Sequence, residues 1–194
     1  EGKKMDILKD WLATFWKIII KPTPETFIEE SKKAQGKLST AIVWIVFSIL
    51  LVYAFIFFAY DYLFHPATII FAILFFPIVF LVFVFFTHLF YQRLFRRKKD
   101  YYSELLYLSV GIFVPLSAIN LLVGLIPNIG LTLANIIWAY LFVLVVIAVK
   151  AVSKLNVWQS IVTVFLGLLF ASIGFLCIPA FLLSMMNAVP GTLH

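Results

Sequence analysis

Histidine is the side chain in this sequence that could most readily bind a metal ion or move a proton, and it occurs three times. His65, His88 and His194 are too widely separated to form a zinc-ligand pattern. The sequence contains neither the His-Glu-x-x-His pair of zinc peptidases nor the Gly-x-Ser-x-Gly turn of serine hydrolases. It also lacks nucleotide-binding glycine motifs. We therefore expect no enzyme activity, no cofactor and no metal, and interpret His88 as a residue of a membrane interface.

Two asparagines are predicted to lie within the membrane as neutral polar residues. Asn120 and Asn135 flank Pro127 on consecutive apolar segments. A rise of about 1.5 Å per residue places both roughly 8–10 Å below one membrane surface. A hydrogen bond between the two helices is the simpler interpretation, and contact with a substrate or partner is the alternative. Asp61 and Glu104 lie at helix ends, so no charge lies deep in an apolar segment.

The composition shows which elements must position these residues. Of the 194 residues, 64% are hydrophobic and 12% are charged, whereas soluble domains are about half apolar and about a quarter charged. Runs without charge cover residues 41–60, 66–92, 105–149 and 155–194. A membrane helix needs roughly 20 apolar residues. The sequence thus predicts an all-α polytopic membrane protein.

Five membrane helices and one interfacial helix are predicted. The membrane helices cover about 39–60, 67–91, 103–126, 129–150 and 156–186, because Pro127 and Asn128 divide the third charge-free run. Residues 1–38 form a cytoplasmic segment, and residues 39–194 form the membrane domain. We expect no cleavable signal peptide, because the lysine-rich first 40 residues contain no apolar core followed by a cleavage site.

The basic residues set the predicted orientation. All 15 lysines and arginines lie in residues 1–40, in the 93–99 loop, or at Lys150 and Lys154. The positive-inside rule places these segments in the cytoplasm, and five crossings then place the C-terminus outside. The membrane would be the plasma membrane in a prokaryote, and the Golgi or endoplasmic reticulum in a eukaryote.

The loop after the second predicted crossing is the candidate lipid-headgroup site. It carries Arg93, Arg96, Arg97, Lys98 and Lys99. Each basic residue near an anionic membrane surface contributes about 1 kcal/mol of attraction. The simpler alternative is that these residues only fix the topology. Nucleic acid is not an expected partner, because the chain has no folded basic domain.

Residues 5–20 have the pattern of an amphipathic helix. One side gathers Met5, Leu8, Trp11, Leu12, Phe15, Trp16 and Ile19, and the other gathers Asp6, Lys9, Asp10, Thr14 and Lys17. Tryptophans opposite lysines are typical of a helix that lies in the membrane interface. The alternative, which is compatible with it, is a helix packed under the bundle that buries the same apolar face against protein. Pro22 and Pro24 are predicted to end this helix.

Small residues and prolines mark two further features. Gly167 and Ala171 lie four residues apart, a spacing that lets helices approach closely. We expect this stripe to contact another membrane protein or a second copy of the chain, and the alternative is packing inside the bundle against the third or fourth crossing. Pro77 and Pro115 fall inside predicted helices and favour kinks there.

The segment from Tyr102 to Lys150 resembles the Yip-domain family, named for Ypt/Rab-GTPase-interacting proteins. The resemblance rests on Ser103-Glu104-Leu105, Pro115, Ile126-Pro127, Gly130, Trp138 and Lys150, and on Pro22-Thr23-Pro24-Glu25-Thr26-Phe27 before them. It implies a five-helix protein that acts in membrane organisation and trafficking. The short N-terminal segment is similar to compact prokaryotic members, so a GTPase partner is not expected.

Two functions follow from these observations. The first is a non-enzymatic scaffold or adaptor that binds other membrane proteins or organises lipid. The alternative is a small transporter, channel or lipid-translocating protein, favoured by the prolines and asparagines within the predicted helices. A continuous polar cavity would favour transport.

Overall fold

The computed structural model describes residues 2–34, 38–60, 66–96, 98–124 and 126–187, and their side chains from residue 9 to residue 173, except 38, 51–53 and 55–76. This part of the chain is helical and contains no strand. The helices are α1 (Gly2–Ile20), α2 (Pro24–Lys32), α3 (Leu38–Tyr60), α4 (Pro66–Leu94), α5 (Tyr102–Gly124), α6 (Gly130–Ser153) and α7 (Val157–Asn187).

The five long helices begin and end within three residues of the predicted ranges. By length and apolar composition, three segments can cross a membrane in the part searched: Pro77–Leu94, Tyr102–Gly124 and Gly130–Ser153. The described side chains of α3 and α7 form shorter apolar stretches, Ser39–Leu50 and Val157–Ile173. The all-α class and a membrane-embedded protein are thus supported, and five crossings stay a prediction.

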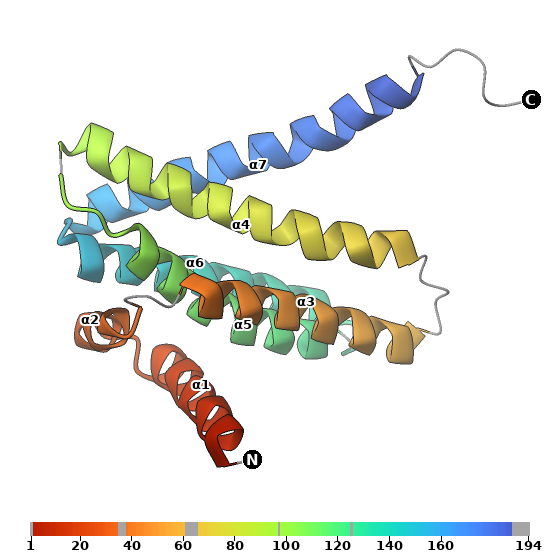
Figure 1. Cartoon of the computed structure of the whole chain (residues 1–194), viewed down its shortest axis with the longest axis horizontal. Coiled ribbons are helices and arrows are strands. Elements are labelled where there is room, and N and C mark those ends of the chain that lie inside the picture. Colours follow the sequence, from red (N-terminus) through yellow and green to blue (C-terminus); the bar gives the residue numbers. More distant parts are fainter. Residues whose placement is uncertain (1, 35–37, 61–65, 97, 125, 188–194) are drawn as a thin grey trace, which may run out of the picture.

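The long helices form two adjoining groups (Figure 1). In one, α4 lies along α7. In the other, α5 packs along α6 and α3. The core is made by inward-facing side chains of α5 and by the C-terminal half of α6, where Leu106, Leu108, Ile112 and Leu144 are fully buried. The N-terminal helices α1 and α2 lie beside this second group, away from α4 and α7 (Figure 1).

The short helix α2 was not predicted from the sequence. Pro22 and Pro24 read as the end of a helix, but Pro24 stands at the start of the next one. The side chain of Thr23 accepts a hydrogen bond from the backbone N–H of Thr26 at 3.3 Å and so caps α2. Proline is well suited to the first helical position, because its missing N–H has no partner there in any helix.

The turn between α5 and α6 follows the predicted break. Asn128 has a positive φ of 67°, a conformation that asparagine tolerates better than most residues. A Cβ atom on Gly130 would lie 2.8 Å from the carbonyl oxygens of Val123 and Gly124. Glycine at this position therefore lets the two helices close tightly. Both α4 and α5 continue through their internal prolines, Pro77 and Pro115.

Candidate functional site

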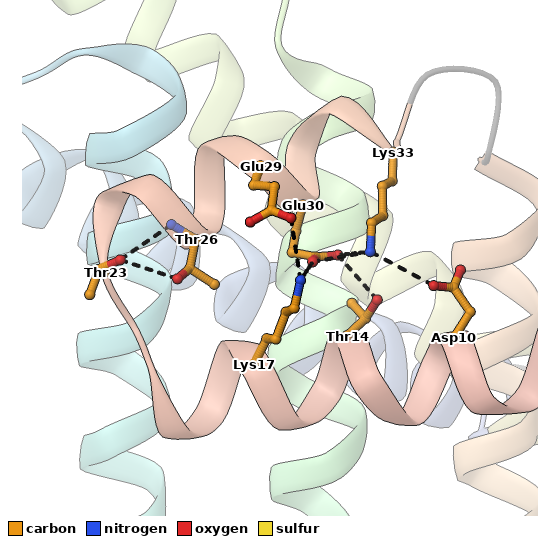
Figure 2. Close-up of polar contacts among 8 residues, drawn as sticks. All are labelled: Asp10, Thr14, Lys17, Thr23, Thr26, Glu29, Glu30 and Lys33. Atoms are coloured by element: carbon orange, nitrogen blue, oxygen red, sulfur yellow. Dashed lines mark hydrogen bonds and ion pairs between the residues drawn. The ribbon is translucent and has the colours of Figure 1, made fainter.

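A buried carboxylate joins α1 to α2. The Glu30 side chain is fully buried. Its carboxylate accepts a hydrogen bond from the Thr14 hydroxyl at 3.1 Å and lies 2.8 Å from the Lys33 ammonium (Figure 2). A third partner, the Lys17 ammonium, is 3.6 Å away. The two cations and the hydroxyl compensate for the desolvation of this carboxylate, which would otherwise be strongly destabilising.

Two exposed carboxylates complete this charge cluster. Glu29 lies 3.3 Å from the Lys17 ammonium, and Asp10 lies 3.8 Å from that of Lys33 (Figure 2). Burial by itself lowers the pKa of Lys33, but the hydrogen bond and negative charge of Glu30 outweigh it and hold the Lys33 pKa above its ordinary value. Because solvent does not reach Glu30, we interpret the cluster as a structural contact that attaches α1 to α2, and not as a reactive site.

The helix α1, attached to α2 in this way, lies along the side of the bundle. Ile18 is fully buried, and its Cδ1 atom lies 3.2 Å from where a Cβ on Gly111 would be. Gly111 is nine residues into α5, about 14 Å along that helix. The Tyr140 hydroxyl of α6 donates a hydrogen bond to the Ile19 carbonyl at 2.7 Å. The first helix therefore flanks α5 and α6 and does not lie beneath the end of the bundle.

The predicted single apolar side of α1 is divided into two faces. Trp11 and Phe15 pack edge-on against the buried Trp44 of α3, with ring centroids 5.3 Å and 4.8 Å away. Leu12 and Trp16 point away from the bundle. Thr14, predicted on the polar side, is buried because it serves Glu30. The prediction was wrong for Thr14, because periodicity alone does not reveal a buried polar partner.

The outward face of α1 is a stripe of exposed apolar residues. Leu12, Trp16 and Ile20 follow one another at four-residue intervals and are 58%, 69% and 51% exposed. We call these three residues the α1 stripe. Lys9 and Lys21, exposed on the same helix or just after it, supply positive charge nearby. An apolar stripe with tryptophan and neighbouring lysines is chemically suited to a membrane interface.

The predicted headgroup site is an exposed basic loop that a histidine holds in place. Arg93, Arg96, Lys98 and Lys99 are exposed, whereas Arg97 lies outside the described residues, as do His65, His194 and Asp61. His88 is buried at the end of α4, and its Nε2 atom lies 3.2 Å from the backbone N of Tyr101 and 3.1 Å from a carboxylate oxygen of Asp100. That oxygen also accepts a hydrogen bond from the N–H of Tyr102. The histidine thus joins α4 to the last residues of the loop, directly before α5.

The two asparagines predicted to pair do not meet. The side-chain oxygen of Asn120 is buried without a hydrogen-bond partner among the described residues. Asn135 is exposed on α6. The spacing predicted that the two asparagines lie at equal depth. Equal depth does not predict contact, because it does not determine which way each side chain points. Glu104 accepts a hydrogen bond from Ser103.

The small-residue stripe of α7 packs inside the chain. A Cβ on Gly167 would lie 2.1 Å from the Thr87 hydroxyl oxygen of α4. Ala171 is also buried. An interface with another chain through this stripe was therefore the wrong expectation, and the internal partner is α4 instead of either helix considered. The spacing correctly indicated close approach, but it carries no information on the identity of the neighbour.

Comparisons with known proteins add no family. No family model, curated protein or solved structure matches this chain. The Yip-domain resemblance consequently stays a proposal. Sequence reasoning missed Glu30, although Thr23-Pro24, a cap followed by a first-turn proline, could have signalled the helix that carries it. Among the described residues, no group of three His, Cys, Asp or Glu side chains is arranged to hold a metal ion.

Proposed function

We propose that this chain is a non-enzymatic integral membrane protein of the Yip-domain type that organises lipid at the cytoplasmic membrane face. Binding of other membrane proteins at that face is the second part of this role. The observation that carries the proposal is the α1 stripe: three large apolar side chains on a helix that the Glu30 cluster fastens to the bundle.

The energetics of the α1 stripe favour lipid. Full burial of a leucine or isoleucine side chain contributes about 1.5–3 kcal/mol. Leu12, Trp16 and Ile20 are each more than half exposed, so most of this contribution is available to a lipid environment. Attraction between nearby lysines and an anionic leaflet adds about 1 kcal/mol per basic residue. A helix already docked on the bundle also loses little conformational freedom when it enters the interface.

The proposed placement has α3 to α7 crossing the bilayer, with the N-terminus in the cytoplasm and the C-terminus outside. Every lysine and arginine then lies on the cytoplasmic side. The basic loop, Arg93 to Lys99, faces the same leaflet as the α1 stripe. Both surfaces thus act on anionic lipid headgroups from one side of the membrane.

Transport of a polar solute is a weaker candidate. Such a path needs polar groups along its length. The cavity that lies between α4, α5, α6 and α7 is lined instead by aromatic and aliphatic side chains and two serines. This lining favours lipid over a polar solute, and so supports the lipid-organising role within the same bundle.

The proposal is tested by amide hydrogen exchange of residues 9–20 in nanodiscs of anionic or zwitterionic lipid. We expect about tenfold slower exchange in anionic lipid, and loss of that difference in a Leu12→Ser/Trp16→Ser variant. Leu131→Ser is the matched control, because Leu131 is 78% exposed at the other end of the bundle. Equal exchange of wild type and stripe variant in both lipids would contradict the proposal.

A further inference from the structure

An apolar cavity of about 410 Å³ lies between the two groups of long helices. Its walls include Phe80 and Phe83 of α4, Phe113 of α5, Trp138 of α6 and Leu168 and Ala171 of α7. Trp138 and Leu168 are 47% and 40% exposed, so the cavity reaches the surface of the bundle. Its volume is within the range of about 300–1,000 Å³ that is typical of small-molecule sites.

The cavity lies at the middle depth of the helices. Ser109 and Phe113 are seven and eleven residues after the start of α5, about 10 Å and 17 Å along that helix. Phe83 is ten residues before Arg93, about 15 Å from the basic end of α4. The cavity therefore lies within about 15 Å of the basic loop along α4.

We infer that this cavity binds one acyl chain of an anionic phospholipid whose headgroup lies against the basic loop. Water is a poor occupant, because a buried water needs two to four polar partners and the walls offer mainly hydrocarbon and aromatic rings. The exposed Arg93, Arg96, Lys98 and Lys99 complement a negative headgroup. The inference rests on the proposed placement of α4 to α7 in a bilayer.

The experiment uses the full chain in nanodiscs of phosphatidylglycerol and phosphatidylcholine in equal amounts with identical acyl chains. Native mass spectrometry after release from the disc counts the lipids that stay bound. We expect one retained lipid per chain, with phosphatidylglycerol favoured several-fold. Ala171→Phe, which fills the cavity from α7, should lower the retained fraction at least fivefold.

Two further variants make the result specific. Ser109→Leu fills the cavity from the α5 wall and should have the same effect, so the test survives if Ala171→Phe fails to fold. Ala139→Phe adds the same bulk at an exposed position of α6 that does not line the cavity, and should retain lipid as wild type does.

Three results would overturn the inference: a correctly inserted wild-type protein that retains no phospholipid, a folded filled variant that retains as much as wild type, or equal retention of the two lipids. Cysteine labelling that places α4 to α7 outside the bilayer would instead contradict the proposed function, and the inference with it. The labelling is measured on the same preparation, so the two failures are distinguishable.

Discussion

Glu30 of α2 accepts a hydrogen bond from Thr14 of α1, sixteen residues earlier in the chain. The carboxylate is fully buried, although it belongs to a helix of only nine residues. The contact orients α1 so that Trp11 and Phe15 face the bundle and the α1 stripe faces outward. The outward orientation of the α1 stripe thus depends on a buried carboxylate.

Glu30→Gln is expected to loosen the attachment of α1 and α2. The substitution preserves size but removes the negative charge that pairs with Lys17 and Lys33, and a hydrogen bond to a charged group typically contributes about 1.5–3 kcal/mol. We expect rapid protease cleavage between residues 9 and 34 and a lower unfolding temperature. Glu29→Gln is the control, because that side chain is 62% exposed and its ion pair contributes at most about 1 kcal/mol. Similar cleavage of the two variants would show that Glu30 does not attach α1 to α2.

Alkaline pH is expected to release the same segment. The folded pKa of Lys33 is raised above its ordinary value of 10.5, so its stabilisation is fully present below pH 10.5 and is lost as the pH rises through the folded pKa. Protease sensitivity of residues 9–34 should therefore increase above about pH 10.5. Lys33→Arg should stay resistant, because arginine remains charged at this pH. An unchanged alkaline profile in Lys33→Arg would assign the transition to another group.

Gly167→Ala is expected to destabilise the folded chain and leave its oligomeric state unchanged. The added Cβ would lie 2.1 Å from the Thr87 hydroxyl oxygen, and such overpacking typically costs about 1–3 kcal/mol. Thermal unfolding in detergent measures the loss, and Thr87→Ala in the same chain should restore part of it. Gly124→Ala is the control, because nothing lies within 4 Å of its added Cβ. Dissociation of an oligomer with no change in the unfolding temperature would instead show that the small-residue stripe of α7 lies on the outside of the bundle.

Five crossings predict opposite locations for the two ends of the chain. With Cys177 replaced by alanine, single cysteines at positions 2 and 191 should react with a membrane-impermeant reagent from opposite faces of sealed vesicles. The position-2 cysteine should react from the cytoplasmic face. Reaction of both from one face would require an even number of crossings.

The sequence contained enough information to predict the long helices. Runs of about 20 uncharged residues have few possible structures other than a membrane helix. Pro127-Asn128 predicted a tight turn, and the positive φ of Asn128 is consistent with that turn. The bounds of α2 were not predictable by treating proline only as a helix breaker. Pro24 begins a helix because Thr23 caps it.

The contacts between helices were less predictable. Gly167 predicted that another helix packs closely against α7. That this neighbour is Thr87 depends on how α4 and α7 lie together, which no local sequence pattern indicates. Thr14 was predicted on the polar side of its helix, and Glu30 was not singled out in the sequence. Their burial follows only from packing α1 and α2 together, where each provides the partner that the other needs.

Trp16 provides the most direct test of the lipid-organising role. A fluorophore is attached to a cysteine at position 16, in the Cys177→Ala background, and the protein is placed in anionic nanodiscs whose lipids carry a quencher partway along the acyl chain. The same fluorophore at Glu29→Cys, exposed on α2, is the control. We predict strong quenching at position 16 and weak quenching at position 29. Quenching at position 16 by aqueous iodide alone, with none from lipid, would contradict the account.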